Sequence, residues 1–450
     1  MTLIPGPPPE TTHSAVPPVT SGVQPVFEPK GEGPRVHLAK DLEAIVDAGG
    51  DEYVGSASVV APLFGQPGPM VTVDFGDWIP EEAFSALAVE TEWRIRIPSL
   101  RQDFPAFQVG FGLSPRPACI RFRPRPFDVV ARYSDRPATR LVFHPLNMPA
   151  FSWPDDRGRQ RTVHLEAGEW RIRLTSLLPG DPETGTFALS AAVEATRTDG
   201  GQFDLEEGRQ ITDAVGFLLG FATGSWRTPM FPVGFDAAGE RTWEIWTTAR
   251  QPSWTRREGP MPLLDARFLE LLAPGYFAFR AQGETESYAI ERAIEWQLAA
   301  NVAEIGVQGP VVVAQAALEL LAWTTLVQRV GMTKEGFEKL PAADKIRLLF
   351  ADLDLPTAIP TTERTQGLVS LAAEHGWVDG PHCLTAIRNA YVHPKIERQR
   401  ALRGRMHGAR DLALWYVEMC ILALCGYRKE YRSRVERLAP WESIIMPGPA

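Results

Sequence analysis

The segment TVHLEAGEWRIRLTSL, residues 162–177, alternates apolar and polar residues on both sides of Gly168. A period of two places successive side chains on opposite faces of a β-strand. Arg171 and Arg173 then share one face, while Trp170 and Ile172 share the other. The segment therefore predicts antiparallel strands with one face exposed to water.

Runs with the same alternation continue on both sides of this segment and are separated by Gly, Pro and Asp, which is typical of an antiparallel sandwich or barrel. They are EYVGSASVV (52–60), MVTVDF (70–75), ALAVETEWRIRIP (86–98), FQVGFGL (107–113), IRFRPRP (120–126), RLVFHP (140–145) and FALSAAVEATR (187–197). One helix is expected within this part, near 205–223, because Asp204 can cap it and acids follow in its first turn. We assign residues 41–285 to a β-rich sensor or specificity region.

Residues 1–40 are rich in Pro and Gly and lack periodic apolar positions, so they are expected to form a disordered tail. The N-terminus has neither a basic region nor an apolar run, and no stretch suggests a membrane span. A cytoplasmic protein is therefore expected. The four cysteines have no paired C-x-x-C spacing and are interpreted as buried thiols, with no metal site.

From 286 onward the apolar residues recur at spacings of three and four, as in "VVVAQAALELLAWTTLVQRV". Pro341 and Pro381 suit helix starts, and Gly376 suits a helix end. Residues 286–440 are thus predicted to form an all-α helical bundle. The fold class is α+β multidomain, with the antiparallel β-rich part in front.

The charge of the chain is unevenly distributed. The net charge is −9, but residues 381–437 hold twelve Lys and Arg against five acids, which is +7 and leaves −16 for the remainder. Such asymmetry can attract an anionic substrate to one end of a protein. A solvated, charged helix face is the alternative interpretation.

Within the basic stretch lies CLTAIRNAYVHPK, residues 383–395. Its apolar stripe is Leu384, Ile387 and Tyr391. Arg388 and Asn389 fall off that stripe.

Pro394 disfavours helical geometry at the residue before it, so His393 is expected at the helix C-terminus. Imidazole can exchange protons near neutral pH. Arg388 and His393 are five residues apart, which separates them by about 140° on an ideal helix. They therefore do not share one face, and a symmetry-related copy of the chain could complete a site.

Arg388, Asn389 and His393 resemble the motif of the HEPN superfamily, whose ribonuclease members carry R-x(4–6)-H with a polar residue, often Asn, after the Arg. Other Arg–His pairs of similar spacing, such as Arg400 with His407, lack the Asn and the helical setting. The resemblance covers roughly residues 286–437 and extends to the β-rich part only by its arrangement in front of the bundle.

The resemblance implies a metal-independent endoribonuclease without cofactor, acting on RNA, with tRNA as one candidate, in bacterial antiphage defence or a toxin-type response. His393 would transfer protons, Arg388 would stabilise the phosphorane, and Asn389 would orient the pair. Lys395 and Arg398 would bind flanking phosphates. A homodimer through the bundle would place two motifs in one cleft.

Other interpretations remain open. Arg388 can instead form an ion pair with a carboxylate such as Glu319, and His393 can simply bond a helix-end carbonyl. The bundle would then be a catalytically silent dimerisation scaffold. A third possibility is a ligand-binding sensor that uses Trp226, Trp243, Trp246 and Trp254, for which core packing is the competing explanation.

Overall fold

The computed structural model describes residues 26–27, 35–48, 50–63, 69–76, 93–112, 119–125, 129–150, 162–178, 181–182, 184–247, 254, 257–263, 265–302, 308–393, 396–402, 404–439 and 441–447. Within these ranges the strands are β1 (Arg35–Ala48), β2 (Asp51–Pro62), β3 (Met70–Asp74), β4 (Trp93–Ile97), β5 (Gln102–Gly112), β6 (Cys119–Pro124), β7 (Val129–Arg132), β8 (Arg140–Pro145), β9 (Thr162–Ala167), β10 (Trp170–Ser176), β11 (Ala191–Arg197), β12 (Pro229–Phe235), β13 (Arg241–Trp246), β14 (Glu430–Tyr431) and β15 (Ile444–Ile445). The helices are η1 (Pro98–Leu100), α2 (Leu205–Thr223), α3 (Arg267–Arg280), α4 (Glu284–Asn301), α5 (Gln308–Trp323), the π-helical η3 (Thr324–Arg329), α6 (Lys334–Lys339), α7 (Ala342–Asp352), α8 (Gln366–His375), α9 (Gly380–Val392), α10 (Ile396–Ala401) and α11 (Met406–Leu424).

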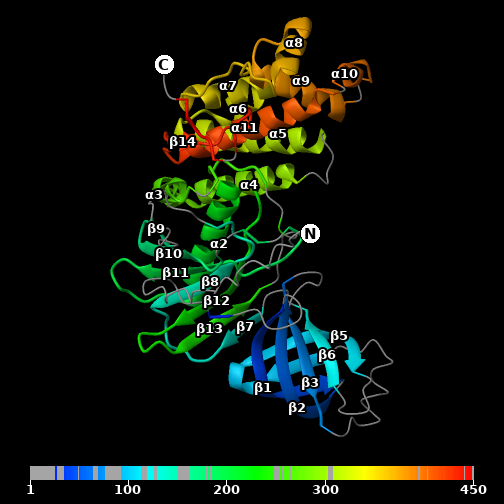
Figure 1. Ribbon diagram of the computed structural model, residues 1–450, viewed down its shortest axis with the longest axis vertical. Helices are drawn as coiled ribbons and strands as arrows, with labels where there is room; N and C mark the ends of the chain where they lie inside the picture. The colour runs from blue at the N-terminus through cyan, green and yellow to red at the C-terminus, as the bar shows by residue number, and fades with distance from the viewer. Residues whose placement is uncertain are drawn as a thin grey trace, which may run out of the picture.

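The β-rich part consists of two separate units rather than one sandwich. In the described residues, β1-β2-β3-β6-β5-β4 form a closed antiparallel barrel, and β7-β13-β12-β8-β11-β10-β9 form a seven-stranded antiparallel sheet. Figure 1 shows the barrel at one end of the molecule, the sheet in the middle and the helices at the other end. The α+β class and the order of its parts are confirmed.

Burial in the strands follows this arrangement. In β10, within the segment that predicted an exposed face, Arg171 is exposed, Arg173 is half-buried and Ile172 is buried. The alternation is complete in β4 of the barrel, where Arg94 and Arg96 are exposed while their neighbours are buried. The central strands β8, β12 and β13 are instead buried at nearly every position. One face of the sheet joins the core that contains α2 and the helices, whereas the other joins the core of the barrel.

The boundaries differ from the prediction at both ends of the β-rich part. β1 begins at Arg35, inside the range assigned to the tail, and Phe27 is buried 5.5 Å from the ring of Phe231. The C-terminal helical part begins with α3 at Arg267 rather than at residue 286. The rest of the predicted tail lies outside the described residues.

The inserted helix is confirmed as α2. The Asp204 carboxylate accepts from the backbone N–H of Glu207, and the Glu207 side chain accepts from the N–H of Asp204. This reciprocal capping box satisfies two donors that a helix start otherwise leaves unbonded. The helix ends at Gly224, whose φ of 68° lies in the left-handed region.

The helix formed by α5 and η3, Gln308–Arg329, is long and apolar enough to cross a membrane by length and composition, a feature that the sequence interpretation did not identify. Of its most apolar window, 61% is buried inside the protein. α5 packs against α4, α7, α9 and α11, which is the position of the core helix of a globular bundle.

Candidate functional site

Three contacts fix the start of α9, the helix that carries the Arg–His motif. The Asp379 carboxylate caps it by accepting from the backbone N–H of His382 at 2.9 Å. Arg347 of α7 donates to both oxygens of Asp379, at 2.6 and 2.9 Å. Gly380 lies against α11 so closely that an added Cβ would fall 1.9 Å from the hydroxyl oxygen of Tyr416. The helix axis is therefore held firmly at its N-terminal end.

The motif lies at the other end of α9, at the end of the molecule away from the barrel (Figure 1). Arg388 and Asn389 are half-buried and lie off the buried stripe, as predicted. The Arg388 Nη1 donates to Asn389 Oδ1 at 3.1 Å. His393 is the C-cap, exposed and in extended geometry, with its backbone N–H bonded to the carbonyl of Asn389 at 3.1 Å. The structure thus joins the side chains of Arg388 and Asn389, and it leaves the His393 ring facing solvent.

The alternative ion pair of Arg388 is not observed. In the described part of the chain, no carboxylate lies within ion-pair distance of Arg388, and its guanidinium bonds only Asn389. Glu319 on α5 accepts from Gln315 at 2.8 Å instead. Arg388 therefore keeps a charge that no protein carboxylate neutralises there.

The two predicted phosphate-binding residues follow α9. Lys395 lies outside the described residues, and Arg398 belongs to α10, with only its backbone described. α10 is tied back to α9 because Gln399 Nε2 donates to the carbonyl of Ala390 at 2.8 Å. The structure therefore places the backbone of Arg398 close to the motif and does not place its side chain.

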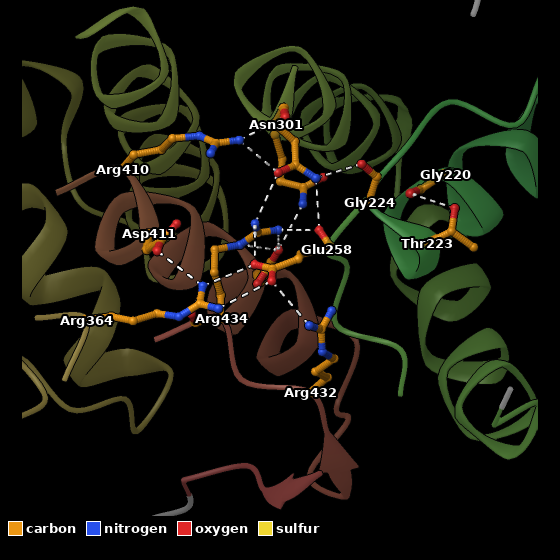
Figure 2. Close-up of polar contacts among 12 residues, drawn as sticks. Gly220, Thr223, Gly224, Glu258, Asn301, Arg364, Arg410, Asp411, Arg432 and Arg434 are labelled. Carbon is orange, nitrogen blue, oxygen red and sulfur yellow. Dashed lines mark hydrogen bonds and ion pairs between the residues drawn. The ribbon is translucent and has the colours of Figure 1, made fainter. Parts of the chain in front are cut away.

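Two arginines of the basic stretch, Arg432 and Arg434, form ion pairs within the protein rather than a free positive surface. Figure 2 shows three arginines converging on the carboxylate of Glu258, which precedes α3. Arg364 and Arg432 approach its oxygens at 3.2 Å, and Arg434 at 3.8 Å. The C-terminal arginines are thus neutralised by an acid that lies 174 residues away along the chain from Arg432.

The same network joins the sheet to the bundle. Arg434 is buried and bonds Glu418 of α11 and the Asn301 side chain of α4, at 2.6 and 3.0 Å. Asn301 in turn donates to the carbonyls of Gly224, at the end of α2, and of Glu258, at 2.7 and 2.8 Å (Figure 2). Elements of both parts of the molecule therefore depend on one buried set of charges. We call Glu258, Asn301, Arg364, Glu418, Arg432 and Arg434 the junction network.

The two carboxylates of the junction network, Glu258 and Glu418, have pKa values shifted in opposite directions. Burial acts to raise the pKa of Glu258, but the hydrogen bond from Arg364 and the charge of Arg434 outweigh it and hold that pKa below its usual range. Burial raises the pKa of Glu418, and Arg434 offsets part of the rise. Sequence reasoning missed this network because its partners are distant in sequence and follow no local pattern.

Of the four tryptophans considered for a ligand site, three pack in the core and one lines a cavity. Trp243, Trp246 and Trp254 are buried in the core. Trp226 is half-buried and lines a cavity of about 550 Å³ between α2, the start of β12 and α4. Arg227, next to it, also lines this cavity. One member of the tryptophan cluster thus borders a space large enough for a ligand.

The sequence predicts no metal site, and buried thiols at the four cysteines, Cys119, Cys383, Cys420 and Cys425. Within the residues that the structure describes, no group of three or more His, Cys, Asp and Glu is arranged to hold a metal ion. Cys383, Cys420 and Cys425 are buried and free, and Cys119 is half-buried. Burial raises the pKa of the Cys383 thiol to about 12, so at neutral pH it is an inert core residue.

Comparison with known proteins divides the chain in a similar way. Residues 133–257, which contain most of the sheet and α2, match a family model described as the YopA central domain, and residues 284–444 match one described as the YopA C-terminal domain. The SPbeta prophage-derived uncharacterized protein YopA of Bacillus subtilis (strain 168) is 24% identical over 275 residues. That alignment covers 58% of this chain and 59% of the relative, which is less than two thirds of its length. No solved structure matches the chain. In its central and C-terminal parts, the chain is therefore similar to the domains of a prophage-derived protein.

Proposed function

We propose that the protein is a metal-independent endoribonuclease of the HEPN type, with its site at the C-terminus of α9. The observation that carries the proposal is the state of Arg388: half-buried, bonded to Asn389, and free of any carboxylate among the described residues. In contrast, Arg347, Arg364 and Arg434 of the same helical part each have a carboxylate partner. An uncompensated guanidinium on a helix that ends at an exposed histidine suits binding of a phosphate.

The reaction uses the ribose itself as nucleophile. The 2′-oxygen forms a bond to the adjacent phosphorus while the bond from phosphorus to the 5′-oxygen breaks, which leaves a 2′,3′-cyclic phosphate and a 5′-hydroxyl. One proton leaves the 2′-hydroxyl and one reaches the 5′-oxygen, so a base and an acid are required. Arg388 would bind the non-bridging oxygens as charge develops, and His393 would carry one of the protons.

A second copy of the chain would supply the other proton-transfer group. Each chain offers one Arg388, within α9, and one His393, at its C-cap, and among the described residues no side-chain hydrogen bond joins the two. Val392 and Ile396, on either side of His393, are 43% and 63% exposed. Apolar side chains at that position fit a contact between two copies, with both motifs in one cleft.

The proposal also assigns roles to the β-rich part and to the basic residues that follow α9. The β-rich part would act as a sensor or specificity region, and Lys395 and Arg398 would hold flanking phosphates. The proposed setting is antiphage defence or a toxin-type response, in the bacterial cytoplasm where the RNA is.

The test is cleavage of total tRNA and a structured mRNA in EDTA, with and without extract of phage-infected cells. Wild type and His407→Ala, which changes an exposed histidine at the start of α11, should yield fragments ending in cyclic phosphate. His393→Ala and Arg388→Ala should yield none while keeping their unfolding temperature. Intact RNA in every lane, or cleavage by His393→Ala, would refute the proposal. A dimer lost in both variants would then favour the silent scaffold.

A further inference from the structure

The wall of the cavity beside Trp226 contains a buried arginine, Arg227, that has no ion-pair partner among the described residues. Arg227 is 3% exposed; its Nε donates to the Thr223 hydroxyl at 2.8 Å and its Nη1 to the carbonyl of Asn147. Its guanidinium lies 5.0 Å from the ring centroid of Trp254. In the described residues, no carboxylate forms an ion pair with Arg227, and its other terminal nitrogen has no hydrogen-bond partner.

A buried charge without a counter-charge is costly. Burial lowers the pKa of Arg227 to about 9, and the charge of Asp181 offsets only part of that effect. Because Arg227 forms part of the cavity wall, an anion within the cavity could reach its unused nitrogen. An anionic ligand in the cavity would therefore stabilise the charged form of Arg227.

Aromatic side chains form another part of the wall. Phe217 of α2 and Trp226 both line the cavity, with ring centroids 5.6 Å apart and planes inclined by 60°. Both rings are half-buried rather than enclosed in the core. Rings of this kind bind flat ligands by stacking, which contributes about 1–3 kcal/mol for a nucleic-acid base.

The remaining charges of the wall limit the charge of the ligand. Arg209 of α2 also lines the cavity and, among the described residues, has no bonded partner. Asp213 and Glu295 line it as well, and Glu295 is paired with Arg292. With Glu295 neutralised by Arg292, the two arginines against one remaining carboxylate suit one anionic group rather than a polyphosphate.

We propose that this cavity binds a small ligand that joins a planar aromatic ring to one anionic group, as a nucleoside monophosphate does. Arg227 and Arg209 bind the anion, and Trp226 with Phe217 contacts the ring. A volume of about 550 Å³ lies within the range of small-molecule sites, and the place between the sheet unit and α4 is typical of them. This site is separate from the α9 motif and does not depend on RNA cleavage.

Isothermal titration calorimetry of the full-length protein with the four nucleoside monophosphates tests the proposal. At least one should bind, and more tightly than its nucleoside or inorganic phosphate alone. Arg209→Ala and Trp226→Leu should each weaken binding about tenfold or more, which corresponds to the loss of one charge-assisted or stacking contact. Arg171→Ala, at an exposed arginine of β10, should bind as wild type does.

Three outcomes would overturn the assignment. The first is the absence of heat and of any rise in unfolding temperature with all four monophosphates at millimolar concentration. The second is equal binding by wild type and by Arg209→Ala and Trp226→Leu. The third is binding of phosphate alone as tight as that of the monophosphates, which would remove the ring from the proposal. Circular dichroism of each variant separates lost binding from lost folding.

Discussion

Arg434 donates to a single carboxylate oxygen of Glu418 through both Nε, at 3.1 Å, and Nη2, at 2.6 Å, and both side chains are buried. Two charges removed from water are stable only when their remaining hydrogen-bonding atoms are also satisfied. Asn301 and the Glu258 carbonyl accept from Arg434, and Gln297 donates to the same Glu418 oxygen, Oε1, whereas the buried Oε2 has no hydrogen-bond partner among the described residues. The pair is therefore the centre of a network whose outer member, Glu258, can be altered without leaving a fully buried charge alone.

Glu258→Gln should lower the free energy of unfolding by about 1–3 kcal/mol, since the amide cannot pair with Arg364, Arg432 and Arg434 as a carboxylate does. Glu258 is 37% exposed, so the lower half of this range is expected. Urea denaturation measures the effect. Glu374→Gln, on an exposed part of α8, is the matched control and should change stability by less than about 0.5 kcal/mol.

The difference between wild type and Glu258→Gln should itself depend on pH. The pKa of Glu258 is lower in the folded protein than in the unfolded chain, so its ionisation stabilises the fold above the ordinary glutamate pKa. That stability is lost as the pH falls through the lower, folded value. The two proteins should therefore converge in stability below about pH 4.5. A constant difference down to pH 3 would show that the charge of Glu258 contributes nothing.

His144 should make the protein sensitive to mild acid in a separate pH range. Burial lowers the pKa of His144 to about 4, and its Nε2 accepts from the backbone N–H of Val26 at 3.1 Å. The unfolded chain takes up a proton below about pH 6.5, whereas the folded one does not, so stability falls between pH 6.5 and 4 by up to about 3 kcal/mol. His144→Gln keeps an acceptor and should flatten this slope. An unchanged slope between pH 6.5 and 5 would exclude His144 as its source.

An excess of His393→Ala mixed with wild type should lower RNA cleavage per wild-type chain if two chains share one site. A mixed dimer has one intact His393 and lacks the second proton-transfer group, whereas a wild-type dimer has both. Subunit exchange followed by the tRNA assay measures the loss. If cleavage per wild-type chain is unchanged although mixed dimers form, then a site shared in this way is excluded. Arg388→Lys, which keeps the charge but loses the forked geometry, should reduce cleavage about 10- to 100-fold.

Cys119 should be the first thiol to react with iodoacetamide in the native protein. With a pKa of about 12, Cys383 is about one part in ten thousand thiolate at pH 8, and burial raises the pKa of Cys420 and Cys425 as well. Cys119 is half-buried at the start of β6. Peptide mass spectrometry should find one modified cysteine in the native state and four in urea. Equal rates for Cys119 and Cys383 would contradict the packing of α9.

Local chemistry made some features predictable from the sequence. Asp204 and Glu207 are three residues apart and cap α2 without help from the rest of the chain. Gly376 closes α8 because a left-handed residue is needed there. The position of Arg388 off the buried stripe of α9 follows from helical periodicity alone.

Features that depend on distant partners could not be predicted. Alternation showed strands but not that β1–β6 close on themselves while β7–β13 form a separate sheet, since strand pairing is set by contacts far apart in sequence. The positive stretch of 381–437 suggested a surface for RNA, yet Arg432 and Arg434 face Glu258. The role of Arg227 could not be predicted, because neither its burial nor its lack of an ion-pair partner among the described residues follows from the local sequence.

The central strand β8 lies between β11 and β12 and is buried on both faces. Its amide protons have no route to water through local fraying, so they should exchange only when the whole sheet opens. The sheet lies between the barrel and the helices (Figure 1) and contributes one face to the core of each. A conformational change that passes from the barrel to the helices must therefore move the sheet as a whole or pass around its edge.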